Sequence, residues 1–552
     1  MSARDVRWYG WGYSDTTYSL DHRPTAWPYL REKLGLTDDQ HAPVVSLDSI
    51  QLRPSRLDET TLTQLRQIVG AEAVATDDRV RIAHSLGKSY RDLIHLRAGR
   101  IPNPTDAVIF PGYEDEIMQV LALATAQRLA VIPFGGGTSV VGGVEPRSER
   151  PTLTLSLARL NKVIAVEAMS QTVTAEAGIV GPDLERALNE RGFMLGHYPQ
   201  SFEFSTVGGW VATRGAGQAS TQYGKIEDMV VGLRIATPSG VIETRNVPAS
   251  SIGPSLLQLL VGSEGTYGVI TRATLRLTPL PKFHQERGLL FHDFHAGVEA
   301  VRAIMQSGLT PAIARLSDED ETRMSFRLRE SRRGWARVRE QIGLALLARA
   351  GRSFERGAVL ILRFEGNDEC ALHECSHALS ICKAQGAFDL GAGPARNWHR
   401  DRFHTPYLRD VLLDHGIVVD TLETAAEWDN VETLHRKLNA AVVEAIAATG
   451  SKALVLTHLS HVYRDGASLY VTFLAKSAPH GELEQWQRIK DAATDCIMRH
   501  GGALSHHHGV GYEHARWIEQ ADSEAGVNAL RAVKRALDPQ SVMNPAKLFD
   551  GA

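Results

Sequence analysis

The chain has 552 residues, 43% hydrophobic and 22% charged, which is the composition of a globular protein and excludes a disordered or fibrous one. Its 60 Lys and Arg against 64 Asp and Glu leave a formal charge of −4, so the basic field that nucleic-acid binding requires is absent and we expect no nucleic-acid partner. Four Cys form no disulfide framework in a chain of this length and favour a reducing, cytoplasmic setting.

No segment indicates export or a membrane span. The N-terminus carries Asp5 and has no apolar core of a signal peptide. The longest uncharged stretches, Leu129–Val144 and Asn246–Ser263, are interrupted by Gly, Pro and Ser. Peripheral contact with a membrane stays open, because a small apolar patch can produce it without changing the composition.

The first 100 residues combine a start rich in Trp and Tyr with helical signals. Asp58–Val69 begins with acidic residues and places Leu62, Leu65 and Ile68 at helical spacing, which predicts a helix. The prolines of Arg100–Pro104 then end this pattern. We therefore predict a mainly helical N-terminal segment over residues 1–100.

Residues 101–280 alternate between strand and helix patterns, which predicts an α+β or α/β domain that ends near Pro279-Leu-Pro281. The expected strands are Ala107–Pro111, Leu129–Pro133, Thr152–Leu157 and Thr172–Glu176. The expected helices are Glu114–Arg128 and Gly181–Arg191.

A second α+β domain is predicted over residues 281–500 and a distinct C-terminal segment over 501–552. The second domain is expected to contain Gly288–Phe291 (strand), Gly297–Ser307 (helix), Thr322–Gly343 (basic helical segment), Ala358–Phe364 (strand), Asp368–Gln385 (helix) and a strand through Thr472. The C-terminal segment reads as a short strand, a His triplet and a helix over Ala525–Leu537.

Three glycine-rich stretches lie in the first domain. Gly135, Gly136 and Gly137 directly follow a predicted strand, so the backbone can turn there and bring its N–H groups close to an anion. The sequence around them matches neither common phosphate loop, and an ordinary tight turn is the alternative. Ser205–Gly217 and Gly262–Ile270 are likewise rich in glycine and other small residues. Three such loops predict a long, phosphate-bearing cofactor laid over the backbone.

Three consecutive histidines, His506, His507 and His508, are candidates for proton transfer near neutral pH. In an extended segment His506 and His508 would face one side and His507 the other. Adjacent residues form a poor metal site, and a solvent-exposed triplet is the alternative.

A zinc-protease pattern, His-Glu-x-x-His, occurs at His373–His377, in a helix that also carries three cysteines. No companion signature for a third ligand follows, and the apolar residues around the motif fit an ordinary amphipathic helix. We therefore expect no metal site in this protein.

Together these stretches resemble the alkyldihydroxyacetonephosphate synthases, a branch of the vanillyl-alcohol-oxidase group of FAD proteins. The Gly-Gly-Gly-Thr-Ser loop and the closing Asn544–Phe549 are shared by the whole group, whereas Ser505–Gly511 and Glu203–Trp210 are specific to the synthases. The full set of matching stretches is Trp8–Tyr13, Pro133–Ser139, Gly196–Trp210, Tyr223–Asp228, Gly262–Thr266, Ser505–Gly511 and Asp538–Phe549.

The resemblance implies an α+β fold, in which an FAD domain (101–280) is completed by the C-terminal segment and a cap or substrate domain lies between them. FAD would be non-covalent, because the Pro133–Ser139 loop has no His or Cys of the kind that carries covalent flavin in relatives. The implied FAD-binding residues are Pro133, Phe134, Gly135, Gly136, Gly137, Thr138, Ser139, Gln200, Ser201, Phe202, Glu203, Phe204, Ser205, Thr206, Thr213, Arg214, Gly215, Ala216, Glu264, Gly265, Thr266, Tyr267, Gly268, Val269 and Ile270.

The implied reaction exchanges the acyl chain of 1-acyl-dihydroxyacetone phosphate for a long-chain fatty alcohol through a flavin N5 adduct, without net redox, and yields an ether-lipid precursor. Tyr470 would be the acid and base, Arg409 a substrate and flavin contact, and Arg315 a residue needed for activity, with the His triplet completing the proton-handling group. Cationic neighbours, Arg409 and protonated His, would have to stabilise the Tyr470 phenolate. The alternative is an FAD oxidoreductase of the same fold acting on a 2-hydroxy acid or alcohol; a non-catalytic FAD protein is a third class.

Some positions depart from the family pattern. Tyr198 and Gln200 replace acidic residues, and His458 stands where the animal enzymes have Arg, which puts the phosphate-bearing substrate in question. The chain also begins almost at the Trp-rich segment, without the peroxisomal extension of the eukaryotic enzymes, so we expect a bacterial, cytoplasmic member. The resemblance further suggests a homodimer acting on lipid-like substrates.

Overall fold

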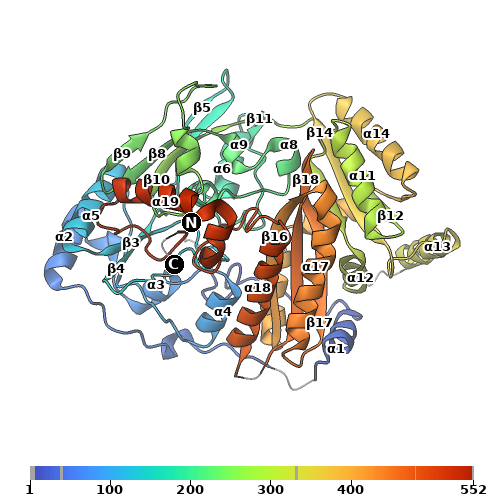
Figure 1. Ribbon diagram of the computed structural model, residues 1–552, viewed down its shortest axis with the longest axis horizontal. Coiled ribbons are helices and arrows are strands. Elements are labelled where there is room, and N and C mark those ends of the chain that lie inside the picture. The colour runs from blue at the N-terminus through green and yellow to red at the C-terminus, as the bar shows by residue number, and fades with distance from the viewer. Residues whose placement is uncertain (1–5, 38–40, 330–333, 479, 550–552) are drawn as a thin grey trace.

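The computed structural model describes residues 6–37, 41–329, 334–478 and 480–549. Two α+β halves lie side by side, and the chain returns from the second half to the first at its C-terminal end, where α19 lies against the first half (Figure 1). None of the described helices is both long and apolar enough to cross a membrane.

The first half contains two main sheets. Four strands in the order β1-β2-β4-β3 form one sheet, in which β2, β4 and β3 are parallel. The second sheet is antiparallel, in the order β5-β6-β10-β8-β9, and β7 pairs with β11 apart from both. The strands are β1 (Val74–Ala75), β2 (Ala107–Ile109), β3 (Ala130–Phe134), β4 (Thr152–Ser156), β5 (Val163–Glu167), β6 (Thr172–Glu176), β7 (Phe193–Met194), β8 (Val230–Thr237), β9 (Gly240–Glu243), β10 (Val269–Arg276) and β11 (Thr278–Pro279).

Several helices of this half begin at polar caps. Asp58 accepts a hydrogen bond from the N–H of Thr61 at the start of α2, and Ser89 and Asp92 form a capping box on α4. Helix α1 (Ala26–Leu34) comes first in the chain but packs against the second half. The helices that follow it are η1 (Leu47–Ser49), α2 (Glu59–Val69), η2 (Ala71–Ala73), α3 (Asp78–Ala83), α4 (Tyr90–Arg97), α5 (Glu114–Gln127), α6 (Gly181–Asn189), α7 (Val207–Thr213), α8 (Ser220–Tyr223), α9 (Ile226–Met229) and α10 (Leu256–Leu260).

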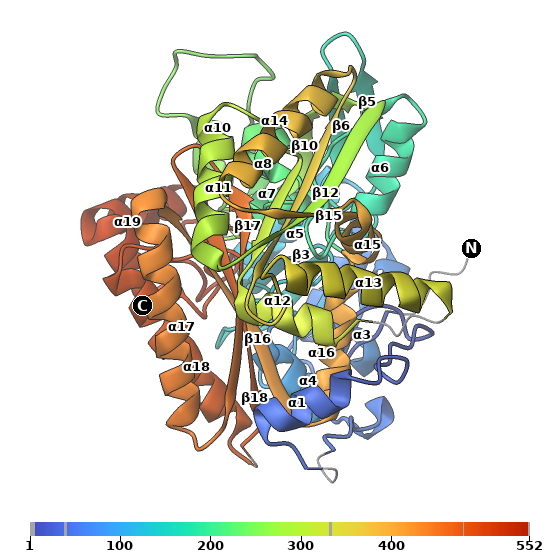
Figure 2. The same cartoon turned by 90° about the vertical axis from the view of Figure 1, so that its right-hand side faces the viewer.

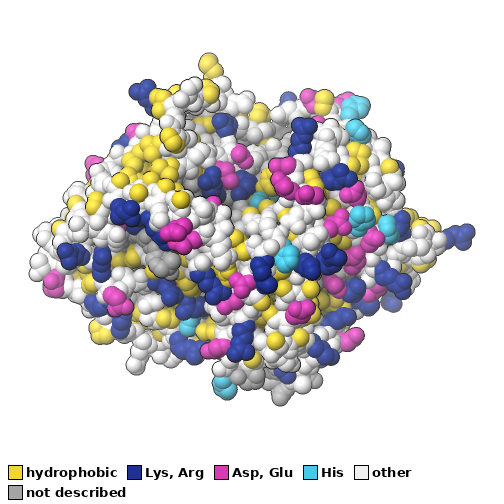
Figure 3. Space-filling view, viewed as in Figure 1, with side chains coloured by type: hydrophobic (Ala, Val, Ile, Leu, Met, Phe, Trp, Pro, Cys, Tyr) yellow, Lys and Arg dark blue, Asp and Glu magenta, His cyan; other side chains and the backbone are white. Residues whose placement is uncertain are grey.

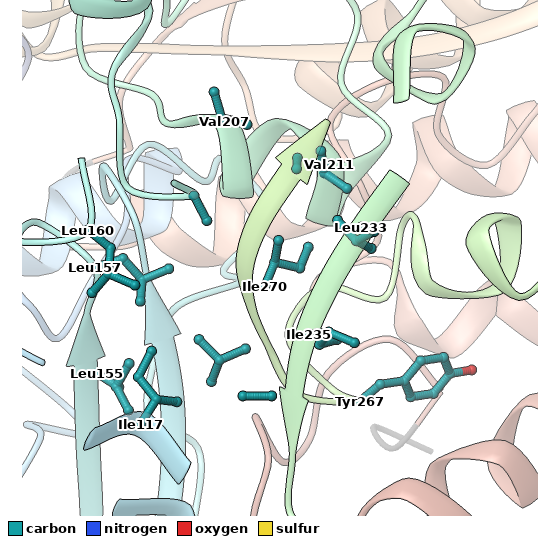
Figure 4. Close-up of a cluster of buried hydrophobic side chains, with 14 of the residues drawn as sticks. Ile117, Leu155, Leu157, Leu160, Val207, Val211, Leu233, Ile235, Tyr267 and Ile270 are labelled. Atoms are coloured by element: carbon teal, nitrogen blue, oxygen red, sulfur yellow. The ribbon is translucent and has the colours of Figure 1, made fainter. Parts of the chain in front are cut away.

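A hydrophobic core joins the two sheets of the first half to α5 and α7. Figure 4 shows Ile117 of α5 and Leu155 of β4 on one side and Ile235 and Ile270 of the second sheet on the other. The C-terminal segment closes this core through η3 (Ala515–Trp517) and α19 (Ile518–Leu537). Buried Lys534 of α19 donates to Asp538 at 2.7 Å and to the carbonyl oxygen of Thr266 at 2.8 Å, which ties the end of the chain to the first half.

The second half is built on one antiparallel sheet of seven strands in the order β15-β12-β14-β13-β17-β18-β16. Because side chains alternate along a strand, residues paired across it share a face. The strands are β12 (Phe283–Phe291), β13 (Ile313–Ser317), β14 (Ala358–Gly366), β15 (Phe388–Gly391), β16 (Ile417–Glu427), β17 (Ala453–Val462) and β18 (Gly466–Lys476).

Helices cover both faces of the seven-stranded sheet, and one of them, α13, projects from the body of the protein (Figures 1 and 2). Helices α11, α14 and α17 bury apolar side chains against the sheet in one cluster, and α17 and α18 continue along β16 to β18 in another. The helices are α11 (Phe294–Gln306), α12 (Glu319–Arg327), α13 (Trp335–Arg349), α14 (Cys370–Ala384), α15 (Gly393–Asp401), α16 (Thr405–Asp414), α17 (Trp428–Ala447) and α18 (Glu482–Arg499).

Most predicted elements are present, with a few corrections. The short strand expected after Gly501 is wrong, because this segment is a succession of bends and turns up to α19. The predicted basic helical segment Thr322–Gly343 corresponds to two helices, α12 and α13, and its residues 330–333 lie outside the described residues. Several strands were not foreseen, among them β5, β8, β13 and β16. The predicted domain limits at 100, 280 and 500 stay predictions.

The His-Glu-x-x-His motif lies on α14 with both histidines exposed, while Cys375 and Cys382 face the core on the opposite side. The thiols of Cys375 and Cys382 therefore cannot join the two imidazoles on one ion. We therefore expect less than about 0.1 mol of zinc per mol of purified protein by elemental analysis. Stoichiometric zinc that is lost in a His377→Ala variant would contradict this prediction.

Candidate functional site

A row of polar side chains crosses the seven-stranded sheet on one face. The register pairs Glu423 of β16 with Tyr470 of β18, Tyr470 with His458 of β17, and His458 with Ser317 of β13. Arg315, two residues before Ser317, lies on the same face and donates to the Ser317 hydroxyl at 2.9 Å. The sheet therefore brings together Arg315 and Tyr470, which the sequence had placed 155 residues apart.

Tyr470 lies between two imidazoles. The ring of His458 stacks on it with centroids 5.0 Å apart, and the ring of His507 stacks at 5.9 Å. His508 meets it edge-on at 5.7 Å. The predicted proton-handling residues are thus in contact with one another around the Tyr470 ring.

The His triplet is held by the carboxylate of Glu423. The backbone N–H groups of His506, His507 and His508 donate to it at 2.6, 3.2 and 2.9 Å, and the Ser505 hydroxyl donates at 2.6 Å. Four donors from four consecutive residues can reach one carboxylate only if the backbone turns around it. The expectation that His506 and His508 face away from His507 is therefore wrong: His507 and His508 both contact Tyr470, and His506 Nδ1 lies 3.0 Å from His507 Nδ1.

Burial decides the charge of these groups. It lowers the pKa of His506 and His507 well below its ordinary value and also lowers that of His508, so burial favours the neutral imidazoles. Burial likewise raises the pKa of Tyr470 to about 12. Burial therefore opposes the expected pairing of protonated histidines with a Tyr470 phenolate, because a buried imidazole loses the hydration that stabilises its charge.

Glu423 is the fixed negative charge of the site. Its burial opposes ionisation, but the three neighbouring imidazoles and the hydrogen bond from Ser505 outweigh it and hold the pKa of Glu423 well below the usual range. At the other end of the row, His458 Nδ1 lies 3.0 Å from both Glu321 of α12 and Arg315. Arg315 donates to the same Glu321 oxygen at 2.8 Å, which forms a partly buried ion pair.

His461 extends the cluster beyond the triplet. The nitrogens of His461, His506 and His507 lie within 4.8 Å of one another, the spacing of a potential metal site in the described part of the chain. Protein groups already occupy several of these nitrogens: His506 Nε2 is 2.6 Å from the Tyr463 hydroxyl, and His461 Nε2 is 2.9 Å from the carbonyl of Gly217. These hydrogen bonds to protein groups help to hold the imidazoles close together.

Arg409 of α16 lies where the cap half meets the glycine-rich loop. Its guanidinium donates to the carbonyl of Lys88 at 2.8 Å, and the N–H of Lys88 donates to the carbonyl of Ser139 at 2.7 Å. Arg409 Nε is buried without a hydrogen-bond partner among the described residues. Burial lowers the pKa of Lys88 to about 8. Two basic side chains and an unused donor at this edge fit an anionic group of a substrate or cofactor.

The three predicted cofactor loops converge. A Cβ on Gly136 would lie 1.9 Å from the carbonyl oxygen of Phe204, and one on Gly265 would lie 3.0 Å from Pro133, so the backbones approach closely. The N–H of Glu264 donates to Ala212 at 2.9 Å. Across the residues that the structure describes, the N–H groups of Gly135 to Thr138 donate no backbone hydrogen bond. This set of free donors fits the phosphates of FAD.

Not every predicted cofactor residue points its side chain toward these loops. Tyr267, Val269 and Ile270 are in the hydrophobic core (Figure 4), so a cofactor could contact only their backbone. Phe202 stacks on Phe403 at 5.3 Å. Gln200, Glu203, Phe204 and Arg214 also bind protein groups: Arg402, Tyr407, Trp11 and Gln258. The remaining predicted residues, Ser201, Ser205, Thr206, Thr213, Gly215, Ala216, Thr266 and Gly268, lie in the turns, helix ends and the approach to β10 around the loops.

Sequence reasoning missed three residues of the site: Glu423, Glu321 and His461. Glu264, foreseen only as a cofactor residue, also holds the histidine loop, because its carboxyl oxygens accept the N–H groups of Val510 and Gly511, each at 2.7 Å. Lone acidic residues in strands carry no local motif. Only the strand register reveals that Glu423 lies beside Tyr470.

Comparison with known proteins accounts for the whole chain. Residues 105–245 match the family described as FAD binding domain, and residues 280–548 match the C-terminal domain of FAD linked oxidases. An alkyldihydroxyacetonephosphate synthase from Dictyostelium discoideum is 34% identical over 99% of this chain and 94% of its own length.

Solved structures agree. An alkyldihydroxyacetonephosphate synthase structure superposes with a TM-score of 0.86 at 31% identity, covering 98% of this chain and 99% of the other. p-Cresol methylhydroxylase superposes at 0.67 with 14% identity, over 90% of this chain and 99% of its own, and shows the shared fold. The expected α+β fold of the vanillyl-alcohol-oxidase type and the FAD cofactor are thereby confirmed, and the chain belongs to the alkyldihydroxyacetonephosphate synthase family of FAD-dependent enzymes.

Proposed function

We propose that the protein exchanges the acyl chain of 1-acyl-dihydroxyacetone phosphate for a long-chain fatty alcohol and so makes the precursor of ether lipids. The observation that carries the proposal is the contact of Tyr470 with the His triplet in a chain that matches a synthase along its whole length. In this exchange the C1–O bond of the ester breaks and the fatty acid leaves. The alcohol oxygen then forms a new C1–O bond and loses its proton, so the ketone and phosphate are unchanged and no net redox occurs.

Tyr470 and the triplet would move the protons. With a pKa near 12, Tyr470 is a protonated phenol at neutral pH and can donate, while the neutral imidazoles of His507 and His508 around it can accept. FAD, when bound, would supply the electrophilic centre that holds the substrate carbon between departure of the fatty acid and arrival of the alcohol.

Two arginines would have separate tasks. Arg409, with its unpartnered Nε and with Lys88 beside it, would bind the substrate phosphate next to the flavin. Arg315 is already paired with Glu321 and lies against His458, so it would support activity by holding His458 against Tyr470. Tyr198, which departs from the family pattern, packs on Phe202 at 5.4 Å, and the guanidinium of Arg402 lies 5.6 Å from the centre of its ring.

Helix α13 would provide contact with a membrane that holds the lipid substrates. Trp335, Val338, Ile342 and Leu346 form an apolar stripe along it and are 42–81% exposed. Figure 3 shows this region as a projecting tip with hydrophobic and basic side chains. A projecting helix with exposed Trp and nearby Arg suits the interface of a bilayer. Cytoplasmic location and a homodimer remain further proposals; the four cysteines are unpaired, as a reducing compartment would leave them.

The cofactor loops should not tolerate a side chain at Gly136. A Cβ there would meet the Phe204 carbonyl oxygen at 1.9 Å, so Gly136→Ala should force the loop apart and reduce bound flavin to less than about a tenth. The ratio of absorbance at 450 and 280 nm measures this loss. Gly526→Ala on α19, where the nearest atom is 3.5 Å away, is the control and should keep its flavin. Acid precipitation of the wild type should release the flavin; flavin retained in the pellet would refute non-covalent binding.

The transferase reaction should depend on Tyr470. Acyl substrate alone should perturb the flavin spectrum and release fatty acid without oxygen consumption, and ether should form only when hexadecanol is added. Tyr470→Phe should keep FAD, because it removes only the hydroxyl. Its kcat should fall about 10²–10⁴-fold, because that hydroxyl is the proposed acid and base. Arg409→Lys should also be costly, since Lys lacks the planar fork.

The competing flavin oxidoreductase predicts the opposite pattern in the same assay. Relatives with 26–28% identity include a glycolate oxidase subunit and a D-2-hydroxyglutarate dehydrogenase. Stoichiometric bleaching by 2-hydroxy acids with recovery in oxygen would support that activity and overturn ours. Full activity in Tyr470→Phe would overturn the role given to this residue.

Membrane contact should depend on the α13 stripe. In flotation with vesicles of phosphatidylcholine and phosphatidylglycerol, the double variant Trp335→Ser and Ile342→Ser should bind about tenfold less than the wild type. Val443→Ser changes an apolar residue of α17 that is 43% exposed and should bind normally. Equal flotation of the double variant and the wild type would exclude α13 as the contact.

A further inference from the structure

The buried carboxylate of Glu423 has no role in any motif, yet more hydrogen bonds of the site converge on it than on any predicted site residue described above. Oε1 accepts from Ser505, His507 and His508, and Oε2 accepts from His506. The side chain is 1% exposed. Such a carboxylate acts as a template for the turn, because no other acceptor is offered to these three consecutive N–H groups among the described hydrogen bonds.

The same carboxylate also fixes the distance between the triplet and Tyr470. Glu423 and Tyr470 are register partners on adjacent strands, so their Cα positions are set by the ladder between β16 and β18. The triplet is hydrogen-bonded to the Glu423 side chain. His507 and His508 therefore contact the Tyr470 ring from a position that the strand pairing fixes. Loss of the hydrogen bonds would release the imidazoles from this position without altering the strand pairing.

Its charge acts on the same groups. His507 Nδ1 lies 3.6 Å and His508 Nδ1 3.7 Å from the carboxylate, which favours imidazolium and partly offsets burial. Besides the triplet, the negative charge of Glu423 acts to raise the pKa of four further residues: Tyr470, His461, Tyr463 and His514. Lys490 of α18 acts to lower the pKa of His508, and Asp420 of β16 acts to raise it. Removal of the Glu423 charge should therefore move the titration of the triplet to lower pH.

We propose that Glu423 is the positioning residue of the active site: through its four hydrogen bonds to Ser505–His508 it orients the His triplet against Tyr470 for proton transfer. This role rests on the transferase function proposed above. The residue touches no reacting atom and acts through the imidazoles.

Glu423→Gln tests the role, because it keeps the size of the side chain but removes the charge and turns one acceptor into a donor that faces an N–H group. We expect kcat to fall about 10²-fold with KM for the acyl substrate within about threefold and with flavin content unchanged. We also expect histidine signals of ¹³Cε1-labelled protein, assigned to the triplet by single substitutions, to titrate at lower pH than in the wild type. The pH profile of kcat should move in the same direction.

The matched control is Glu286→Gln. Glu286 is a buried carboxylate of the same sheet, on β12, paired with Arg363, and it has no contact with the triplet. It should lower the thermal midpoint and leave the pH profile and the triplet signals unchanged. If Glu423→Gln resembles this control, with kcat within threefold of the wild type, the proposal is wrong.

Ser505→Ala covers the case in which Glu423→Gln does not fold. It removes one of the four donors and leaves the carboxylate, so kcat should fall about tenfold with KM unchanged, and an unchanged kcat would overturn the proposal. The titration of the labelled histidines needs no substrate. It therefore decides the link between Glu423 and the triplet even if the wild type proves to act on a different substrate, which the ether assay reports independently.

Discussion

The attachment of one short loop to two buried carboxyl groups is the constraint on which the site depends. Ser505–His508 is hydrogen-bonded to Glu423 in the cap half, and Val510 and Gly511 are hydrogen-bonded to Glu264 in the FAD half. The loop is therefore fixed to both halves at once. A rotation of one half against the other would break hydrogen bonds to buried carboxyl oxygens, each of which costs about 1–3 kcal/mol when left unmade. The imidazoles thus keep one position relative to both the flavin loops and Tyr470.

Burial and pairing divide the charges of this region into two zones. Around Tyr470 burial favours neutral imidazoles, and the negatively charged carboxylate of Glu423 accepts hydrogen bonds from backbone N–H groups. The positive charges of Lys88 and Arg409 lie where these residues meet the glycine-rich loop through Ser139, and Arg409 also lowers the pKa of Tyr470 against the effect of burial. A phosphate would be drawn to the second zone and proton exchange confined to the first. Separation of these tasks lets a dianionic substrate bind without protonating the groups that must accept its proton.

Local signals in the sequence foretold much of this structure. The strand before the glycine run and the helix predicted from Asp58 depend on contiguous residues, and both form nearly where expected. What the sequence could not show depends on register and on partners distant in the chain. In the sequence nothing distinguishes Glu423 from the other acidic residues, of which there are 64 in all. Its place beside Tyr470 becomes visible only when β16 is paired with β18. The alternation expected for His506–His508 failed for the same reason, since a strand was assumed where a carboxylate 83 residues away in sequence imposes a turn.

His458 shows how a departure from the family pattern can be absorbed. The His458 imidazole stacks against the Tyr470 ring and keeps contact with Glu321 through Nδ1. Arg315 then supplies the positive charge of that pair. Burial together with Arg315 lowers the pKa of His458, so the ring is a neutral, planar support for the phenol. Burial raises the pKa of Tyr470 to about 12 and so keeps its phenol protonated, with the His458 ring stacked on one side and the His507 ring also stacked against it.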